Sequence, residues 1–125
     1  MKYIIDSYAW IEYLEGSKAG EKVNQIINSD NEIYILPITI AELVSKAKRR
    51  NSNHQLMYES VIKSKILNIS PKIAREAGLL HAEMRKKFDQ FGIVDAILIS
   101  TAKEIKAKII TGDNHFKQFK EAIII

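Results

Sequence analysis

The stretch Lys2-Tyr3-Ile4-Ile5-Asp6 is a short apolar and aromatic run that ends in an acid, and Ser7 follows it. β-Branched and aromatic residues favour a strand, and apolar residues at helical spacing begin directly afterwards. A strand that passes straight into a helix is typical of a parallel α/β sheet. In such sheets the binding crevice lies at the carboxyl ends of the strands, which is where Asp6 falls.

Three further acids, Glu42, Asp95 and Asp113, also lie at the ends of apolar runs. If all four reach one edge of the sheet, their charges oppose folding, because two carboxylates about 5 Å apart repel by roughly 3 kcal/mol at an effective dielectric of about 20. A hard divalent cation removes this conflict, and oxygen ligands alone indicate Mg²⁺ or Mn²⁺. We therefore predict that Asp6, Glu42, Asp95 and Asp113 are metal ligands and catalytic residues.

Strand and helix patterns alternate along the 125 residues, which predicts one α/β domain over residues 1–125 with a parallel sheet covered on both faces. The short run 66–69 is expected to be a buried strand of this sheet. The expected strands are 2–6, 32–36, 66–69, 108–111 and 122–125. The expected helices are 7–15, 17–28, 39–50, 54–65, 71–88, 94–106 and 114–119.

The composition excludes several classes of site. The chain has no cysteine, which rules out disulfides, thiolate zinc sites and cysteine nucleophiles. No apolar stretch has the length of a signal-peptide core, and none approaches the roughly 18 residues that cross a bilayer. We therefore expect a soluble, cytoplasmic protein without a membrane partner.

The charge balance indicates a polyanionic partner. Without the four proposed ligands, 11 acidic residues face 19 lysines and arginines. The densest basic clusters contain Lys46, Lys48 and Arg49, and Arg85 and Lys86. Basic side chains around a metal-filled acidic centre suit a polyanion whose phosphates contact both. Ordinary solvated helix ends explain each cluster equally well when it is taken alone.

Each acid also has a structural explanation of its own. Asp6 can cap the helix that follows it, and Glu42 can close a capping box with Thr39. Asp95 suits the first turn of a helix, and Asp113 suits a tight turn. The placement of all four at the same predicted edge of the sheet favours the metal site.

Four motifs in order carry a family likeness: Ile4-Ile5-Asp6-Ser7 with Trp10, 38–43, 95–99 with 101–102, and 110–116. Through them the chain resembles PIN-domain ribonucleases, and in size and pattern the VapC-type toxins of toxin–antitoxin pairs. The resemblance implies a three-layer α/β/α sandwich with a central parallel sheet of four to five strands.

The resemblance also implies an activity and partners. It implies an endoribonuclease dependent on Mg²⁺ or Mn²⁺, in which metal-activated water hydrolyses RNA phosphodiester bonds at Asp6, Glu42, Asp95 and Asp113. Hydrogen bonds from the residues matching Ser7 and Thr111 would support these acids. A cognate antitoxin and a homodimer are further implications.

Three alternatives remain open at this point. The chain could be a housekeeping RNA-processing PIN nuclease, or a non-catalytic α/β module that binds metal or RNA. Metal-free RNA cleavage by histidines is the third, although the spacing of His54, His81 and His115 indicates no pair. We predict His81 to be a core or interface residue, and Trp10 and Tyr13 to pack in the core rather than to stack on a base.

Overall fold

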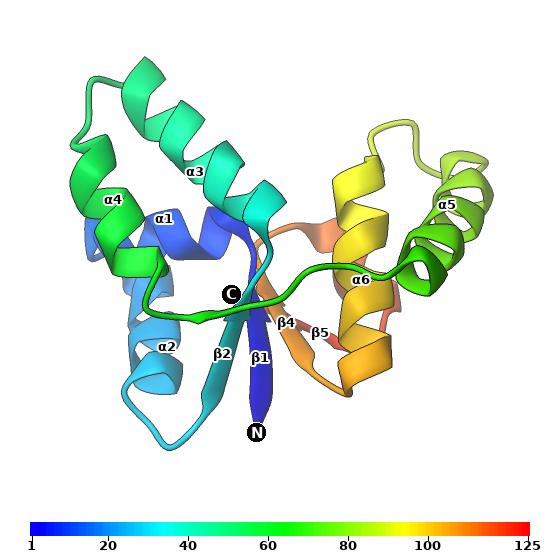
Figure 1. Ribbon diagram of the computed structural model, residues 1–125, viewed down its shortest axis with the longest axis horizontal. Helices are drawn as coiled ribbons and strands as arrows, with labels where there is room; N and C mark the ends of the chain where they lie inside the picture. The colour runs from blue at the N-terminus through cyan, green and yellow to red at the C-terminus, as the bar shows by residue number, and fades with distance from the viewer.

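Five parallel strands form the central sheet of the computed structural model, which describes residues 1–125 (Figure 1). The strand order is β3-β2-β1-β4-β5, so the first strand of the chain lies in the middle. The strands are β1 (Lys2–Ile5), β2 (Glu32–Ile35), β3 (Lys65–Ile66), β4 (Lys108–Thr111) and β5 (Ala122–Ile124). The helices are α1 (Ser7–Glu15), α2 (Lys18–Ile27), α3 (Pro37–Arg49), α4 (His54–Val61), α5 (Pro71–Arg85), α6 (Ile93–Ile105) and the 3₁₀ helix η1 (Asn114–Gln118).

Helices cover both faces of the sheet, because neighbouring residues of each strand point to opposite sides. Ile5 and Ile110 pack in one core with residues of α1, α2, α3 and α4, whereas Ile4 and Ile109 pack in a second core with α6. Figure 1 shows these two groups of helices on either side of the strands, with α5 outside α6. The predicted three-layer α/β/α fold is confirmed.

Side-chain caps fix the starts of four helices. Asp6, Ser17, Asn53 and Ser70 each accept a hydrogen bond from a backbone amide in the first turn of α1, α2, α4 and α5. Such caps stabilise a helix by about 0.5–2 kcal/mol. Gly16, at φ 70°, ends α1 in the left-handed conformation that favours glycine. None of the helices has both the length and the apolar character needed to cross a membrane.

The start of α3 differs from the prediction. The helix begins at Pro37, and Leu36 precedes it without a side-chain cap. Proline suits the first helical position because its missing N–H would have no partner there. Thr39 therefore lies inside the first turn, where its buried hydroxyl has no hydrogen-bond partner, and the proposed capping box with Glu42 is wrong. Glu42 is left in the second turn of the helix.

The edge of the sheet at β3 also differs from the prediction. Only Lys65–Ile66 forms this strand, and 48% of the Ile66 surface is exposed, so the expected buried strand over 66–69 is wrong. The preceding helix α4 ends at Val61, four residues earlier than expected. β3 pairs only with β2, and an edge strand with one neighbour is not buried as a central strand is.

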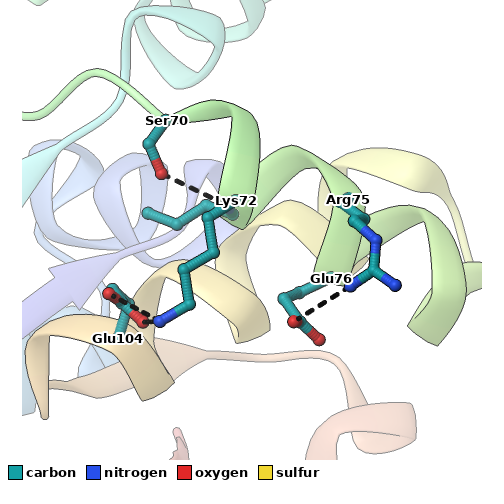
Figure 2. A network of polar contacts seen from close by, with 6 residues as sticks. Ser70, Lys72, Arg75, Glu76 and Glu104 are labelled. Carbon is teal, nitrogen blue, oxygen red and sulfur yellow. Dashed lines mark hydrogen bonds and ion pairs between the residues drawn. The ribbon is translucent and has the colours of Figure 1, made fainter.

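The helices α5 and α6 pack mainly through apolar contacts. Ala77 and Met84 of α5 lie in one buried cluster with Phe91 and Ala96. On the surface, Lys72 of α5 and Glu104 of α6 form an ion pair with Nζ and Oε2 3.2 Å apart (Figure 2). Both side chains are exposed, so the pair contributes about 0–1 kcal/mol at most. The buried cluster therefore holds α5 against the helix that carries Asp95.

The crossing of α1 and α2 depends on Gly20, because a Cβ atom there would lie 2.1 Å from the carbonyl oxygen of Glu12. We expect Gly20→Ala to lower the free energy of unfolding by about 1–3 kcal/mol, since the two helix backbones must separate. Gly78→Ala, in open space on α5, is the matched control and should raise it by about 0.5–1 kcal/mol through helix propensity. Urea denaturation measures both, and equal shifts for the two variants would contradict this account.

Candidate active site

Asp6 reaches the carboxyl edge of the sheet through the pairing of β1 with β4. Ile5 lies opposite Ile110 in the parallel register, and the Asp6 amide donates to the Ile110 carbonyl at 3.1 Å. Asp6 therefore lies beside Thr111, whose hydroxyl donates to the Asp6 carboxylate. The Ala9 amide donates to Asp6 Oδ1 at 2.8 Å, so the predicted helix-capping role is present as well. Only 8% of Asp6 is exposed.

Asp113 joins this site through the same threonine. Its backbone amide donates to Thr111 Oγ1 at 3.0 Å, so one hydroxyl serves both acids, as a donor to Asp6 and as an acceptor for Asp113. Asp113 Oδ1 accepts from the His115 amide at 2.8 Å and lies 3.3 Å from His115 Nδ1. The turn after β4 is therefore ordered around Thr111.

Asp95 and Glu42 come from opposite layers of the sandwich. Asp95 lies in the first turn of α6, and its Oδ2 accepts from the Gly92 amide at 2.9 Å. Glu42 lies in the second turn of α3, on the other side of the sheet, and its surface is exposed. Figure 1 shows the first turns of α3 and α6 on either side of the ends of β1 and β2. The candidate site thus draws on both helical layers.

Pairs of these four acids lie close enough for the charge of one to raise the pKa of another. The pKa of Asp6 is raised to about 6, mainly by burial and to a smaller extent by the charges of Asp95 and Asp113, against hydrogen bonds from Thr111 and Ala9. Loss of hydration also raises the pKa of Glu42, as does the charge of Asp95. The carboxylates of Asp6, Asp95 and Asp113 therefore repel one another, and that of Glu42 is repelled by Asp95.

Asp95 lies in the middle of this group of charges. Burial raises its pKa and the charge of Asp113 adds to the effect, while the hydrogen bond from Gly92 and the imidazoles of His115 and His81 lower it. His81 was predicted to be a core or interface residue, and it is half-buried on α5 beside this carboxylate. This placement is not predictable from the sequence, because it depends on how α5 packs against α6.

The chemistry of the donors fits a hard divalent cation, although no three of the acidic or histidine side chains are grouped closely enough here to form a metal-binding cluster. Asp6, Asp95 and Asp113 each use one carboxylate oxygen to accept from a backbone amide. These bonds fix the orientation of each carboxylate separately. A cation would relieve the repulsion among them.

The other predicted site residues are Ser7 and the basic residues of α3 and α5. Ser7 is half-buried, and its hydroxyl makes no hydrogen bond to a carboxylate in the structure, so its supporting role stays a prediction. Lys46 lies one turn after Glu42 and lowers the pKa of that acid. The remaining basic residues are exposed near the ends of α3 and α5, namely Lys48, Arg49, Arg85 and Lys86, and the last of them pairs with Glu83.

The sequence predicts the positions of Trp10 and Tyr13 but not that of Tyr8. Trp10 is 3% exposed and its ring packs edge-on against Tyr13, which confirms their core role. Tyr8 was not singled out from the sequence, yet 45% of its surface is exposed and its ring lies against Gly112, next to Asp113. Its position two residues after Asp6 is the signal that could have identified it.

Comparison with known proteins places the chain in a family. The family model of the PIN domain matches residues 3–122. The chain belongs to the PIN domain family. No curated protein sequence matches the chain.

Several solved structures share this PIN fold. A toxin–antitoxin complex from Klebsiella pneumoniae has a chain 22% identical, with a TM-score of 0.75 over 97% of this chain and 95% of that one. VapBC2 from Rickettsia felis, bound to a promoter DNA fragment, is 23% identical, with a TM-score of 0.75 over 100% and 98%. VapC20 from Mycobacterium tuberculosis, described as a sarcin–ricin-loop-cleaving toxin, is 11% identical, with a TM-score of 0.71 over 94% and 95%. At these identities the likeness establishes the fold.

The raised pKa of Asp6, about 6 against an ordinary 3.8, makes stability depend on pH. The folded state binds this proton more tightly than the unfolded state, so the metal-free protein should lose stability as pH rises between these values. Asp6→Asn keeps an oxygen for the Ala9 amide but removes the charge. We expect it to raise the free energy of unfolding near neutral pH by up to about 3 kcal/mol, and far less at about pH 4.

Urea denaturation with a chelator present, at both pH values, measures this difference. Asp30→Asn, in an exposed turn before β2, is the control and should change stability little at either pH. If Asp6→Asn is the less stable protein at both pH values, the charge of Asp6 does not oppose folding.

Proposed function

We propose that this PIN-domain protein is a metal-dependent endoribonuclease and the toxin of a toxin–antitoxin pair. The observation that carries the proposal is the electrostatic coupling of Asp6, Glu42, Asp95 and Asp113 at the carboxyl edge of the sheet. Acids that repel one another cost stability, and hydrolysis of a phosphodiester offers a reason to keep them together. RNA as substrate would place the activity in the cytoplasm.

Asp6 and Asp95 are the proposed principal ligands of Mg²⁺ or Mn²⁺, and Asp113 ligates directly or through water. The bound cation would supply a water of lowered pKa and offset charge on the scissile phosphate. Glu42 is exposed and has a raised pKa, which suits it to orient the attacking water and to take up its proton. The Thr111 hydroxyl keeps Asp6 and Asp113 in place through its two hydrogen bonds.

A second candidate mechanism uses no metal. Both His81 and His115 lie close enough to Asp95 to lower its pKa, so an imidazole acid and an imidazole base could border one substrate. RNA cleavage that persists with a chelator, and that is lost in His115→Ala, would favour this mechanism.

A housekeeping RNA-processing role shares the metal chemistry and differs only in the absence of an antitoxin.

Asp95→Asn tests the metal mechanism, because the amide can still accept from Gly92 but is a poor ligand. We expect Mn²⁺-dependent RNA cleavage to fall at least about 100-fold, as for the loss of other metal-site contacts. Without metal, the variant should be folded and at least as heat-stable as the parent, since a repelling charge is gone.

The assay follows degradation of total RNA and of a short labelled RNA with Mn²⁺, with Mg²⁺ and with a chelator. Asp30→Asn, away from the four acids, controls for the loss of an aspartate and should keep its activity. Residual activity within about tenfold of the parent, about 1.4 kcal/mol in barrier height, would mean that Asp95 is not a ligand.

We propose that a cognate antitoxin covers an apolar hollow of about 220 Å³ between α1, α3 and α4. Two structural relatives were solved as toxin–antitoxin assemblies, which supports such a partner. The hollow is lined by apolar side chains, namely Ile11, Leu14, Ala47, Leu56 and Met57, with Lys46 and Arg50 at its border. From this position an inhibitor arginine or lysine could compete with the metal for the carboxylates.

We also propose a homodimer, which light scattering would show as twice the chain mass.

Leu56 tests the antitoxin site, because 57% of its surface is exposed in the hollow. We expect Leu56→Glu to prevent co-purification with the product of a short neighbouring reading frame, and to leave RNA cleavage intact. Leu79→Glu on α5, with the same 57% exposure, is the matched control and should keep the partner. Loss of the partner in both variants, or in neither, would argue against this surface.

A further inference from the structure

Tyr8 lies between two of the four acids. It is the second residue of α1, two positions after Asp6, and its ring covers Gly112, the residue before Asp113. A Cβ atom at Gly112 would lie 2.1 Å from Tyr8 Cε1, so only glycine allows the ring to lie this close to the backbone. The ring therefore borders the candidate site from a fixed position, and 45% of the Tyr8 surface is open to solvent.

A polar contact holds the other end of the Tyr8 side chain. Its hydroxyl donates to the carboxylate of Glu12, one turn further along α1, and Glu12 also accepts from the Ser17 hydroxyl. The negative charge of Glu12 raises the pKa of Tyr8, and the ordinary pKa of a tyrosine already keeps the phenol neutral at physiological pH. A neutral phenol is no proton acceptor for the hydrolysis, and what it offers a ligand is the exposed part of its ring.

No other aromatic side chain has this combination of exposure and position. Trp10 and Phe116 are buried, and the ring of His115 stacks on Phe88 with centroids 5.0 Å apart. Tyr58 is 41% exposed but lies on α4, a helix that supplies none of the four acids. An exposed ring beside acids proposed to hold a cation at the scissile phosphate is placed to meet the base next to that phosphate.

We propose that Tyr8 is a platform on which an unpaired base next to the scissile phosphate stacks. This inference rests on the proposed function and adds a residue that would position the RNA strand. Stacking on aromatic side chains tolerates any base, because every base has a π-face. In a helix the bases already stack on one another, so only a loop, bulge or end can offer a free base. Tyr8 would then orient the RNA strand, and the cation held by the acids would act on the scissile phosphate.

The experiment measures RNA binding separately from cleavage. All proteins carry Asp95→Asn, and fluorescence anisotropy follows their binding to a labelled unstructured RNA and to the same RNA with abasic nucleotides. We expect Tyr8→Ala to weaken binding of the base-bearing RNA about tenfold, which corresponds to about 1.4 kcal/mol of stacking. Binding of the abasic RNA should be unchanged. Tyr8→Phe keeps the ring and should bind both RNAs like the parent.

Two further variants control for exposure and for folding. Tyr58→Ala removes a tyrosine of similar exposure and should bind both RNAs like the parent. Tyr8→Leu keeps apolar volume over Gly112, so it should melt like the parent yet bind the base-bearing RNA as weakly as Tyr8→Ala. The proposal is overturned if Tyr8→Ala binds the base-bearing RNA like Tyr58→Ala, if it loses abasic RNA equally, or if Tyr8→Phe is equally weak.

Kinetics of the parent chain, without Asp95→Asn, separate this inference from the proposed function. With Mn²⁺, Tyr8→Ala should raise KM for a short single-stranded RNA about tenfold and leave kcat little changed. If the parent cleaves RNA but KM is the same in Tyr8→Ala, the platform is wrong and the nuclease stands. If the parent cleaves no RNA while base-dependent binding still requires Tyr8, the nuclease is wrong and the platform stands.

Discussion

The parallel pairing of β1 with β4 is the constraint on which the rest of the site depends. The register that sets Ile5 opposite Ile110 also sets Asp6 beside Thr111, and Thr111 in turn holds the backbone of Asp113. A shift of one residue would turn the side chains of β1 to the other face of the sheet. The buried isoleucines that fix the register are therefore also what brings the acids together.

The hydrogen bonds of the aspartates to backbone amides are compatible with the catalytic role proposed for them. Asp6, Asp95 and Asp113 all bind backbone amides in the way that the conservative interpretation of each residue expects. Each of these amides fixes the orientation of one carboxylate. Backbone amides at two helix starts and one turn thus fix the positions of three carboxylates whose charges repel one another.

The sequence predicts the architecture well because apolar runs and helix signals are local. Strand β4 and helix α1 have the predicted limits. It fails where tertiary context decides: Pro37 starts α3 two residues early, and β3 is short because it lies at the edge of the sheet. In the candidate site, the pairing of β1 with β4 places Asp6 and Asp113 at one edge of the sheet, and this much follows from topology.

The neighbours of these acids do not follow from the sequence. His81 reaches Asp95 only through the packing of α5 against α6, and Tyr8 is distinguished from Trp10 only by which side of α1 faces the core.

The order of the strands also has a consequence for synthesis. Because β4 is made late but pairs with the first strand, a ribosome must deliver nearly the whole polypeptide before Asp6 meets Thr111 and Asp113. Interrupted translation therefore releases fragments in which these carboxylates have not been brought together.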